Sequence, residues 1–144
     1  MECVIVYWSR YGHGKKLVDF LVERLEENDW KVISETPEKL DPKNMPESDL
    51  YVFSSPTEAF RIKRDMRKFM KKIEGLDNRP YGIINTHFMK KNWLKNMEKI
   101  LSKKKNMNKL AEIDFRIERD KAEKKEGLPE NWVKDLKKFS DQLI

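Results

Sequence analysis

Short apolar runs alternate with amphipathic stretches along the chain, and this alternation limits the possible folds more than any other feature. Five runs are predicted to be β-strands, at residues 3–8, 30–35, 49–55, 81–86 and 111–118. The first, third and fourth runs are apolar nearly throughout, which is typical of central strands covered on both faces. The last run alternates apolar and polar residues, which indicates an edge strand.

Helical patterns fill the gaps between these strands. Apolar residues recur at helical spacing within 17–25, 62–73 and 93–101, and Pro129 is predicted to be the first residue of a last helix. The link at 36–48 carries three prolines and is predicted to be a loop or a very short helix. Strands that alternate with helices imply βαβ units and a parallel sheet, so the fold class is α/β. A chain of 144 residues without a repeat or linker is expected to form one domain, residues 1–144.

The composition excludes several kinds of protein. A single cysteine, Cys3, excludes a disulfide framework and a cysteine-built zinc site, and its place in the first apolar run predicts a core residue. Two histidines without a matching carboxylate cluster predict no metal site. No apolar run is long enough for a membrane span, and the start lacks the pattern of a signal peptide, so a cytoplasmic protein is expected.

Basic residues are unevenly distributed. The net charge is +6, acids outnumber bases between residues 19 and 49, and bases dominate between residues 61 and 109. One account is a solvated surface rich in lysine and glutamate. The other is a basic face for an acidic partner or a nucleic acid. Nucleic acid binding is not expected, because the aromatic residues occur in core patterns and none is left for base stacking.

A glycine-rich turn, SRYGHGK at residues 9–15, follows the first strand and opens the first helix. Gly12 and Gly14 would let the backbone approach an anion, and Ser9 would add a hydroxyl donor. The amides at a helix start and the helix dipole attract negative charge. In a doubly wound sheet, ligands bind at the carboxyl ends of the strands. The turn therefore predicts a phosphate site, with an empty tight turn as the alternative.

Two common phosphate loops fit this turn poorly. The nucleotide-triphosphate loop requires a glycine where Ser9 stands and a magnesium-binding hydroxyl where Lys16 stands. The dinucleotide fingerprint requires a third glycine, and Leu17 occupies that position.

A third loop type matches better. SRYGHG resembles the [ST]-x-[TY]-G-x-[TG] phosphate loop of the flavodoxin family, and especially the S-x-YGH variant of its flavin-dependent quinone reductase branch. YVFSSPTEAF (51–60) resembles the family's third strand with the flavin-contacting loop after it, and INTHF (84–88) resembles the loop after the fourth strand. The order of elements matches over residues 1–144. The resemblance implies a three-layer, doubly wound, five-stranded parallel sheet in the order 2-1-3-4-5, with the two basic helices on the same side of it.

The resemblance also implies FMN as the cofactor and assigns residues to it. The phosphate would be held by Ser9, Arg10, Tyr11, Gly12, His13 and Gly14. The flavin ring would be lined on one side by Pro56, Thr57, Glu58, Ala59 and Phe60, and on the other by Thr86, His87 and Phe88. The alternatives are that Phe60 begins the core of the next helix, and that His13 and His87 are surface loop residues.

The implied function is an FMN-binding protein that carries electrons between redox partners, as a monomer or weak dimer, here with an acidic partner protein. Two departures bear on this. Many family members have a glycine in the second loop, whose peptide rotates on flavin reduction, whereas no glycine occurs between Gly14 and Gly75. Most flavodoxins are acidic, whereas this chain is basic. The alternatives are an FMN-dependent reductase or oxidase acting on a quinone, metal complex or porphyrin, and a flavin-free binding module on the same fold.

Overall fold

A parallel sheet forms the centre of the computed structural model, which describes residues 1–58, 61–118 and 127–144. Its parallel strands are β1 (Glu2–Tyr7), β2 (Lys31–Glu35), β3 (Leu50–Glu58), β5 (Pro80–His87) and β6 (Asn108–Arg116). Their order is β2-β1-β3-β5-β6, and every neighbouring pair is parallel. Taken in chain order, these are strands 2-1-3-4-5, so the predicted order and fold class are confirmed.

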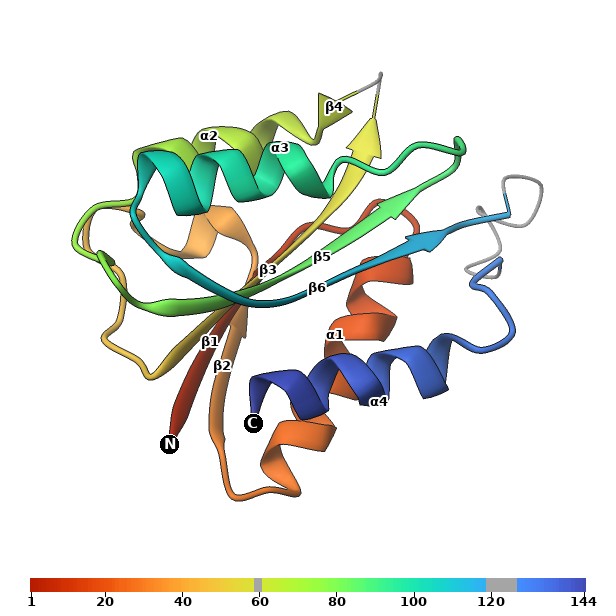
Figure 1. Ribbon diagram of the computed structural model, residues 1–144, viewed down its shortest axis with the longest axis horizontal. Coiled ribbons are helices and arrows are strands. Elements are labelled where there is room, and N and C mark those ends of the chain that lie inside the picture. Colours follow the sequence, from red (N-terminus) through yellow and green to blue (C-terminus); the bar gives the residue numbers. More distant parts are fainter. Residues whose placement is uncertain (59–60, 119–126) are drawn as a thin grey trace.

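Helices cover both faces of the sheet (Figure 1). One face is covered by α1 (His13–Glu26) and α4 (Trp132–Leu143). The other is covered by α2 (Arg64–Lys72) and by α3 (Leu94–Glu98), which continues as the π-helix η2 (Lys99–Lys104). The link between β2 and β3 contains the short 3-10 helix η1 (Pro37–Lys39), as predicted. The two basic helices, α2 and α3 with its continuation η2, thus cover the same face of the sheet, as the resemblance implied. Within the described residues, no helix combines the length and the apolar character that a membrane span requires.

The core has two halves, one on each side of the sheet. Val4 and Val6 of β1 pack under α2 and α3, whereas Cys3 and Ile5 pack against α1 and α4. This alternation explains why β1 is apolar on both faces. Burial raises the pKa of the Cys3 thiol to about 12. The thiol is therefore protonated at neutral pH, in agreement with the predicted core role.

The short strand β4 (Arg61–Ile62) corrects two predictions. β3 continues through residues 56–58, which were predicted to be a loop, and its end pairs antiparallel with β4. Ile62 was predicted to belong to the following helix, but it pairs with Thr57, and the helix begins at Arg64. The Ile62 side chain is only 2 % exposed and packs in the same core half as the apolar residues of α2. An apolar residue at this spacing therefore looked like part of the helix.

The last helix also begins later than predicted. Trp132, and not Pro129, is its first residue. The Trp132 amide donates to the Pro129 carbonyl oxygen at 3.0 Å, which makes an isolated turn ahead of the helix. The residues that α4 buries in the core, Leu136, Phe139, Ser140 and Leu143, all lie beyond this turn.

Gly82 of β5 lies tightly against side chains of α4. A Cβ atom at this position would lie 2.8 Å from Leu143 Cδ2 and 3.1 Å from Phe139 Cζ. We expect Gly82→Ala to lower the free energy of unfolding by about 1–3 kcal/mol, because overpacking forces neighbouring side chains to move. Chemical denaturation measures this loss. Leu143→Ala makes room beside Gly82, so the double variant should lose less than the two single losses added. A Gly82→Ala protein as stable as the parent would contradict this packing.

Candidate functional site

The carboxyl ends of β1, β3 and β5 meet at one edge of the sheet and surround a pocket. Its lining comes from the turn after β1, the ends of β3 and β5, and the residue that follows β6: Ser9, Arg10, Tyr11, His13, Gly14, Pro56, Thr57, Glu58, Thr86, His87, Phe88 and Ile117. The structure thus brings the three predicted segments together. Gly12 lies in the turn without lining the pocket, and Ala59 and Phe60 lie outside the described residues.

The turn after β1 has the geometry that its glycines predict. Gly12 has φ +91°, a left-handed conformation in which a residue with a Cβ atom is strained. Its amide donates to Ser9 Oγ at 3.1 Å, and the hydroxyl keeps its own hydrogen as a further donor. A Cβ atom at Gly14 would lie 3.2 Å from the Trp8 carbonyl oxygen, so that position is also tight.

Helix α1 begins at this turn and presents its amino end to the pocket. Its first intrahelical bond runs from the Lys16 amide to the Gly12 carbonyl oxygen at 2.9 Å. The amides of Gly14 and Lys15 precede this bond, so the helix itself offers them no acceptor. The first turn contains no acidic residue. Amide donors and the positive end of the helix dipole therefore face the same place, and this is the arrangement that binds anions.

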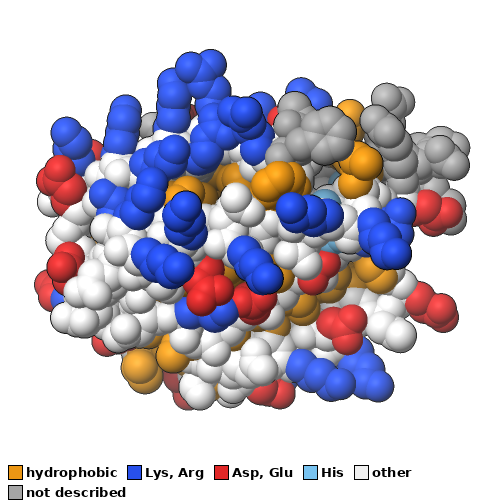
Figure 2. Space-filling view, turned by 45° about the horizontal axis from the view of Figure 1, so that its top comes forward, with side chains coloured by type: hydrophobic (Ala, Val, Ile, Leu, Met, Phe, Trp, Pro, Cys, Tyr) orange, Lys and Arg blue, Asp and Glu red, His pale blue; other side chains and the backbone are white. Residues whose placement is uncertain are grey.

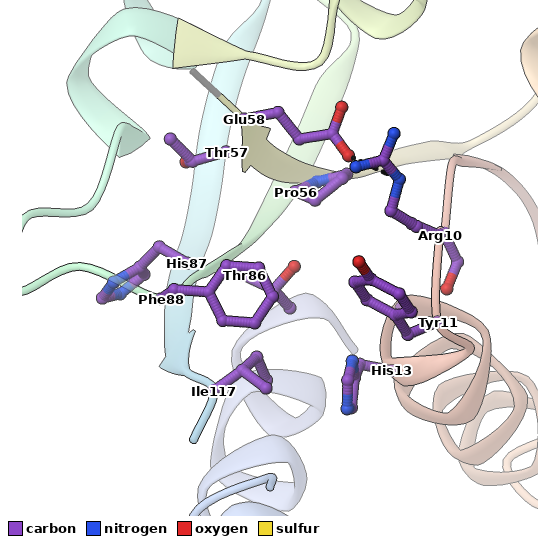
Figure 3. A pocket seen from close by; sticks show the side chains of 12 residues that line it. Arg10, Tyr11, His13, Pro56, Thr57, Glu58, Thr86, His87, Phe88 and Ile117 are labelled. Atoms are coloured by element: carbon purple, nitrogen blue, oxygen red, sulfur yellow. Dashed lines mark ion pairs between the residues drawn. The ribbon is translucent and has the colours of Figure 1, made fainter. Parts of the chain in front are cut away.

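Two aromatic rings define the other half of the pocket. Tyr11 and Phe88 point toward one another across it (Figure 3), with ring centroids 6.4 Å apart and planes at 64°. The pocket between the segments has a volume of about 30 Å³. That volume holds no more than one or two waters. Tyr11 and Phe88 are both half-buried, so a planar ligand enters this slot only if one of the two rings turns aside.

His87 contributes to the pocket in a different way from its neighbour Phe88. Its ring is turned away from Tyr11 (Figure 3), with Nδ1 2.5 Å from the Met89 carbonyl oxygen and Nε2 2.6 Å from Asp114 Oδ2. His87 therefore fixes the backbone after β5 from within the protein. Both histidines of the chain are buried, so the alternative that His13 and His87 are surface loop residues is wrong.

Comparison with solved structures places this architecture among known folds. No protein-family model matches the chain, and no curated protein matches it. The flavodoxin from Streptococcus pneumoniae is 17% identical and matches with a TM-score of 0.78, over 99% of this chain and 97% of that chain. The two-electron-reduced flavodoxin from Megasphaera elsdenii is 13% identical, with a TM-score of 0.75 over 96% of this chain and 97% of that chain. Rubredoxin oxygen:oxidoreductase from Desulfovibrio gigas is 15% identical, with a TM-score of 0.74 over 98% of this chain but 34% of that chain.

The chain has the flavodoxin fold. The resemblance seen in the sequence is therefore confirmed at the level of the fold. At these identities the likeness carries no activity, because one fold serves many functions and activity depends on the site.

Within this flavodoxin fold, an ion-pair network joins the turn after β1 to the β3–β4 hairpin. Glu58 Oε1 lies 3.3 Å from Arg10 Nε, and Glu58 Oε2 lies 3.2 Å from Lys63 Nζ. Lys63 Nζ also lies 4.2 Å from the centroid of the Trp8 ring, a cation–π distance. One carboxylate thus faces two cations, and this part of the rim is net positive.

Asp114 and Ile117 belong to the site but were not predicted. Asp114 holds His87, and Ile117 lines the pocket just beyond β6. Both depend on the register of β6 against β5, which shifts at an irregularity between Tyr81 and Gly82. The alternating pattern of the last strand indicated that it was an edge strand, but it carried no signal for this register.

A cationic face lies next to the site, on the side of the sheet that α2 and α3 cover. It consists of Arg64, Arg67, Lys68, Lys71, Lys72, Lys95, Lys99, Lys103 and Lys104. Figure 2 shows lysine and arginine side chains gathered on this side of the molecule. Among residues 1–58, 61–118 and 127–144, no ion pair neutralises any of these side chains.

Proposed function

We propose that this protein binds FMN at the carboxyl ends of β1, β3 and β5 and carries electrons between redox partners. The observation that carries the proposal is the turn at Gly12, whose left-handed backbone lies at the amino end of the 14-residue helix α1. The same turn shares one pocket with residues of the two segments whose sequences resemble the family's ring-contacting loops. The flavodoxins among the similar solved structures support the proposal.

The residues present fit the two halves of FMN differently. Ser9 and the amides of Gly14 and Lys15 suit a phosphate dianion, because each supplies a hydrogen-bond donor at the positive end of the α1 dipole. Tyr11 and Phe88 suit the ring, because either can pack on its face once the slot opens. When bound, FMN would supply reversible one- or two-electron redox chemistry, while the protein orients it, excludes water and sets the surrounding charge.

Purified protein tests this proposal. We expect it to bind FMN with the absorbance bands of a protein-bound flavin, and to pass electrons to an external acceptor protein. Turnover of a quinone with a nicotinamide donor would instead favour the reductase. The observation that favours this second candidate is the pairing of Thr57 and Glu58 with β4, in a segment without glycine, whereas many family members have a glycine-containing loop there. Protein that binds no flavin would leave the flavin-free binding module.

The proposed partner is an acidic redox protein that docks on the cationic face in the cytoplasm. Exposed charges are screened beyond roughly 10 Å at 0.1 M salt, so the association rate should fall steeply with ionic strength.

A small acidic iron–sulfur protein serves as the probe in stopped-flow electron transfer. Lys95→Glu/Lys99→Glu should slow the transfer and flatten its salt dependence. Lys31→Glu, on the exposed amino end of β2, is the matched control and should change neither. A salt-independent rate would mean that the lysines only solvate the surface.

A further inference from the structure

Asn85 connects the two segments that face the ring half of the pocket. It lies in β5 with no exposed surface. Its Nδ2 donates to the Ser55 carbonyl oxygen at 3.0 Å and to Thr57 Oγ1 at 2.9 Å. Its Oδ1 accepts the Trp93 amide at 2.9 Å. One side chain thus holds the end of β3, the end of β5 and the residue that precedes α3.

These contacts join one pocket-lining residue, Thr57, to the segment that carries another, Phe88. Thr57 lines the pocket from β3, and Phe88 lines it from the segment that leaves β5 and returns at Trp93. Trp93 is the N-cap of α3, so its amide has no acceptor within the helix and depends on Asn85. Only an amide side chain offers two donors and an acceptor at once, so neither leucine nor aspartate reproduces all three contacts.

We infer that Asn85 is a positioning residue for the flavin ring, because it sets the spacing between the Thr57 and Phe88 sides of the pocket. The inference rests on the proposed FMN function. Asn85 makes none of its contacts with the turn at residues 9–14, so its effect should be confined to the ring half. FMN and riboflavin share the ring and differ in the phosphate, and this difference makes the inference measurable.

Two variants and a control test this role by flavin fluorescence quenching. Asn85→Leu and Asn85→Asp should weaken FMN and riboflavin by the same factor, roughly tenfold or more, as a loss of about 1.4 kcal/mol implies. The ratio of the two dissociation constants should stay at the wild-type value. Asn108→Ala is the control, because Asn108 Nδ2 donates to the Asn78 carbonyl oxygen at an exposed site away from the pocket. It should change neither constant.

A loss of stability alone does not weaken binding to a variant that remains folded, so chemical denaturation is measured on each variant. A folded Asn85 variant with wild-type affinity for both ligands would overturn the inference. A variant that loses FMN affinity but keeps riboflavin affinity would overturn it too. Wild-type protein that binds neither ligand would instead contradict the proposed function.

Hydrogen exchange of the flavin-free protein tests the hydrogen bond from the Trp93 amide to Asn85 without any ligand. In wild type the Trp93 amide should exchange slowly, although it precedes a helix that offers it no acceptor. In the folded Asn85 variants its protection should disappear, and in Asn108→Ala it should remain. Fast exchange of the Trp93 amide in the wild-type protein would overturn the inference by itself, even if neither Asn85 variant folds.

Discussion

Gly12→Val is expected to weaken FMN binding by roughly 100-fold, about 2.8 kcal/mol, while the protein stays folded. Gly12 has φ +91°, which a β-branched residue adopts only with strain. Valine should therefore move the turn, and with it Ser9, whose hydroxyl accepts the Gly12 amide, away from the amino end of α1. The core is spared because Gly12 lies in a half-buried turn. Fluorescence titration measures the affinity, and far-ultraviolet circular dichroism reports the fold.

Gly75→Val is the matched control for this substitution. Gly75 also has a positive φ, +76°, with nothing within 4 Å of its would-be Cβ atom, and it lies between α2 and β5, at the opposite end of the sheet from the pocket. The control should lose stability through the same kind of backbone strain and keep its affinity for FMN. If Gly12→Val bound FMN as tightly as wild type, the assignment of the turn to the phosphate would be wrong.

The second large effect concerns the two one-electron potentials of the bound flavin, which should lie closer together than in an acidic flavodoxin, or cross. The two positive charges of Arg10 and Lys63 exceed the one negative charge of Glu58 at the rim of the pocket. Arg116, whose Nε donates to the Phe88 carbonyl oxygen at 3.2 Å, adds a third positive charge beside the pocket. One positive charge about 8 Å from a fully reduced, anionic flavin, at an effective dielectric of about 20, contributes roughly 2 kcal/mol, or on the order of 90 mV. Solvent screening reduces this figure.

The backbone beside the ring acts in the same direction. Thr57 and Glu58 pair with β4, and no glycine is present in the hairpin, so the peptide rotation that favours the first electron in many flavodoxins is opposed here. Spectroelectrochemical titration should show the two electrons entering together. Lys63→Met should lower the second potential, whereas Lys103→Met at the far end of η2 should not. Two well-separated one-electron steps would contradict this prediction and favour the electron carrier over the reductase.

The fold was predictable because each central strand is apolar on both faces, which sequence pattern records directly. The hairpin was not predictable, because β4 is only two residues long and Ile62 falls on the helical spacing of Met66 and Phe69. A two-residue strand is too short to show a period of two, so its residues were assigned to the helical pattern that follows. The prediction that Pro129 is the first residue of the last helix was wrong for a similar reason, because proline is equally compatible with a turn just before a helix.

The two halves of the site differ in how far the sequence reveals them. The turn at residues 9–14 has a local signature, because positive φ, a hydroxyl and a helix start all fall within six residues. Asn85 and Asp114 have no such signature. Asn85 bonds Ser55 and Thr57 across 30 and 28 residues, and Asp114 meets His87 across 27. These contacts exist only once the register of three strands is fixed.

Titration of flavin-free protein with FMN is the decisive test of whether this pocket binds a flavin, with riboflavin as the matched ligand. We expect saturable quenching of flavin fluorescence with one FMN per chain. We also expect riboflavin to bind more weakly by roughly 100-fold, because the amino end of α1 and Ser9 act on the phosphate alone. Equal affinity for the two ligands would contradict the phosphate role of the Gly12 turn. The absence of quenching up to roughly 1 mM FMN, a binding free energy weaker than about 4 kcal/mol, would contradict the claim that this pocket is a flavin site.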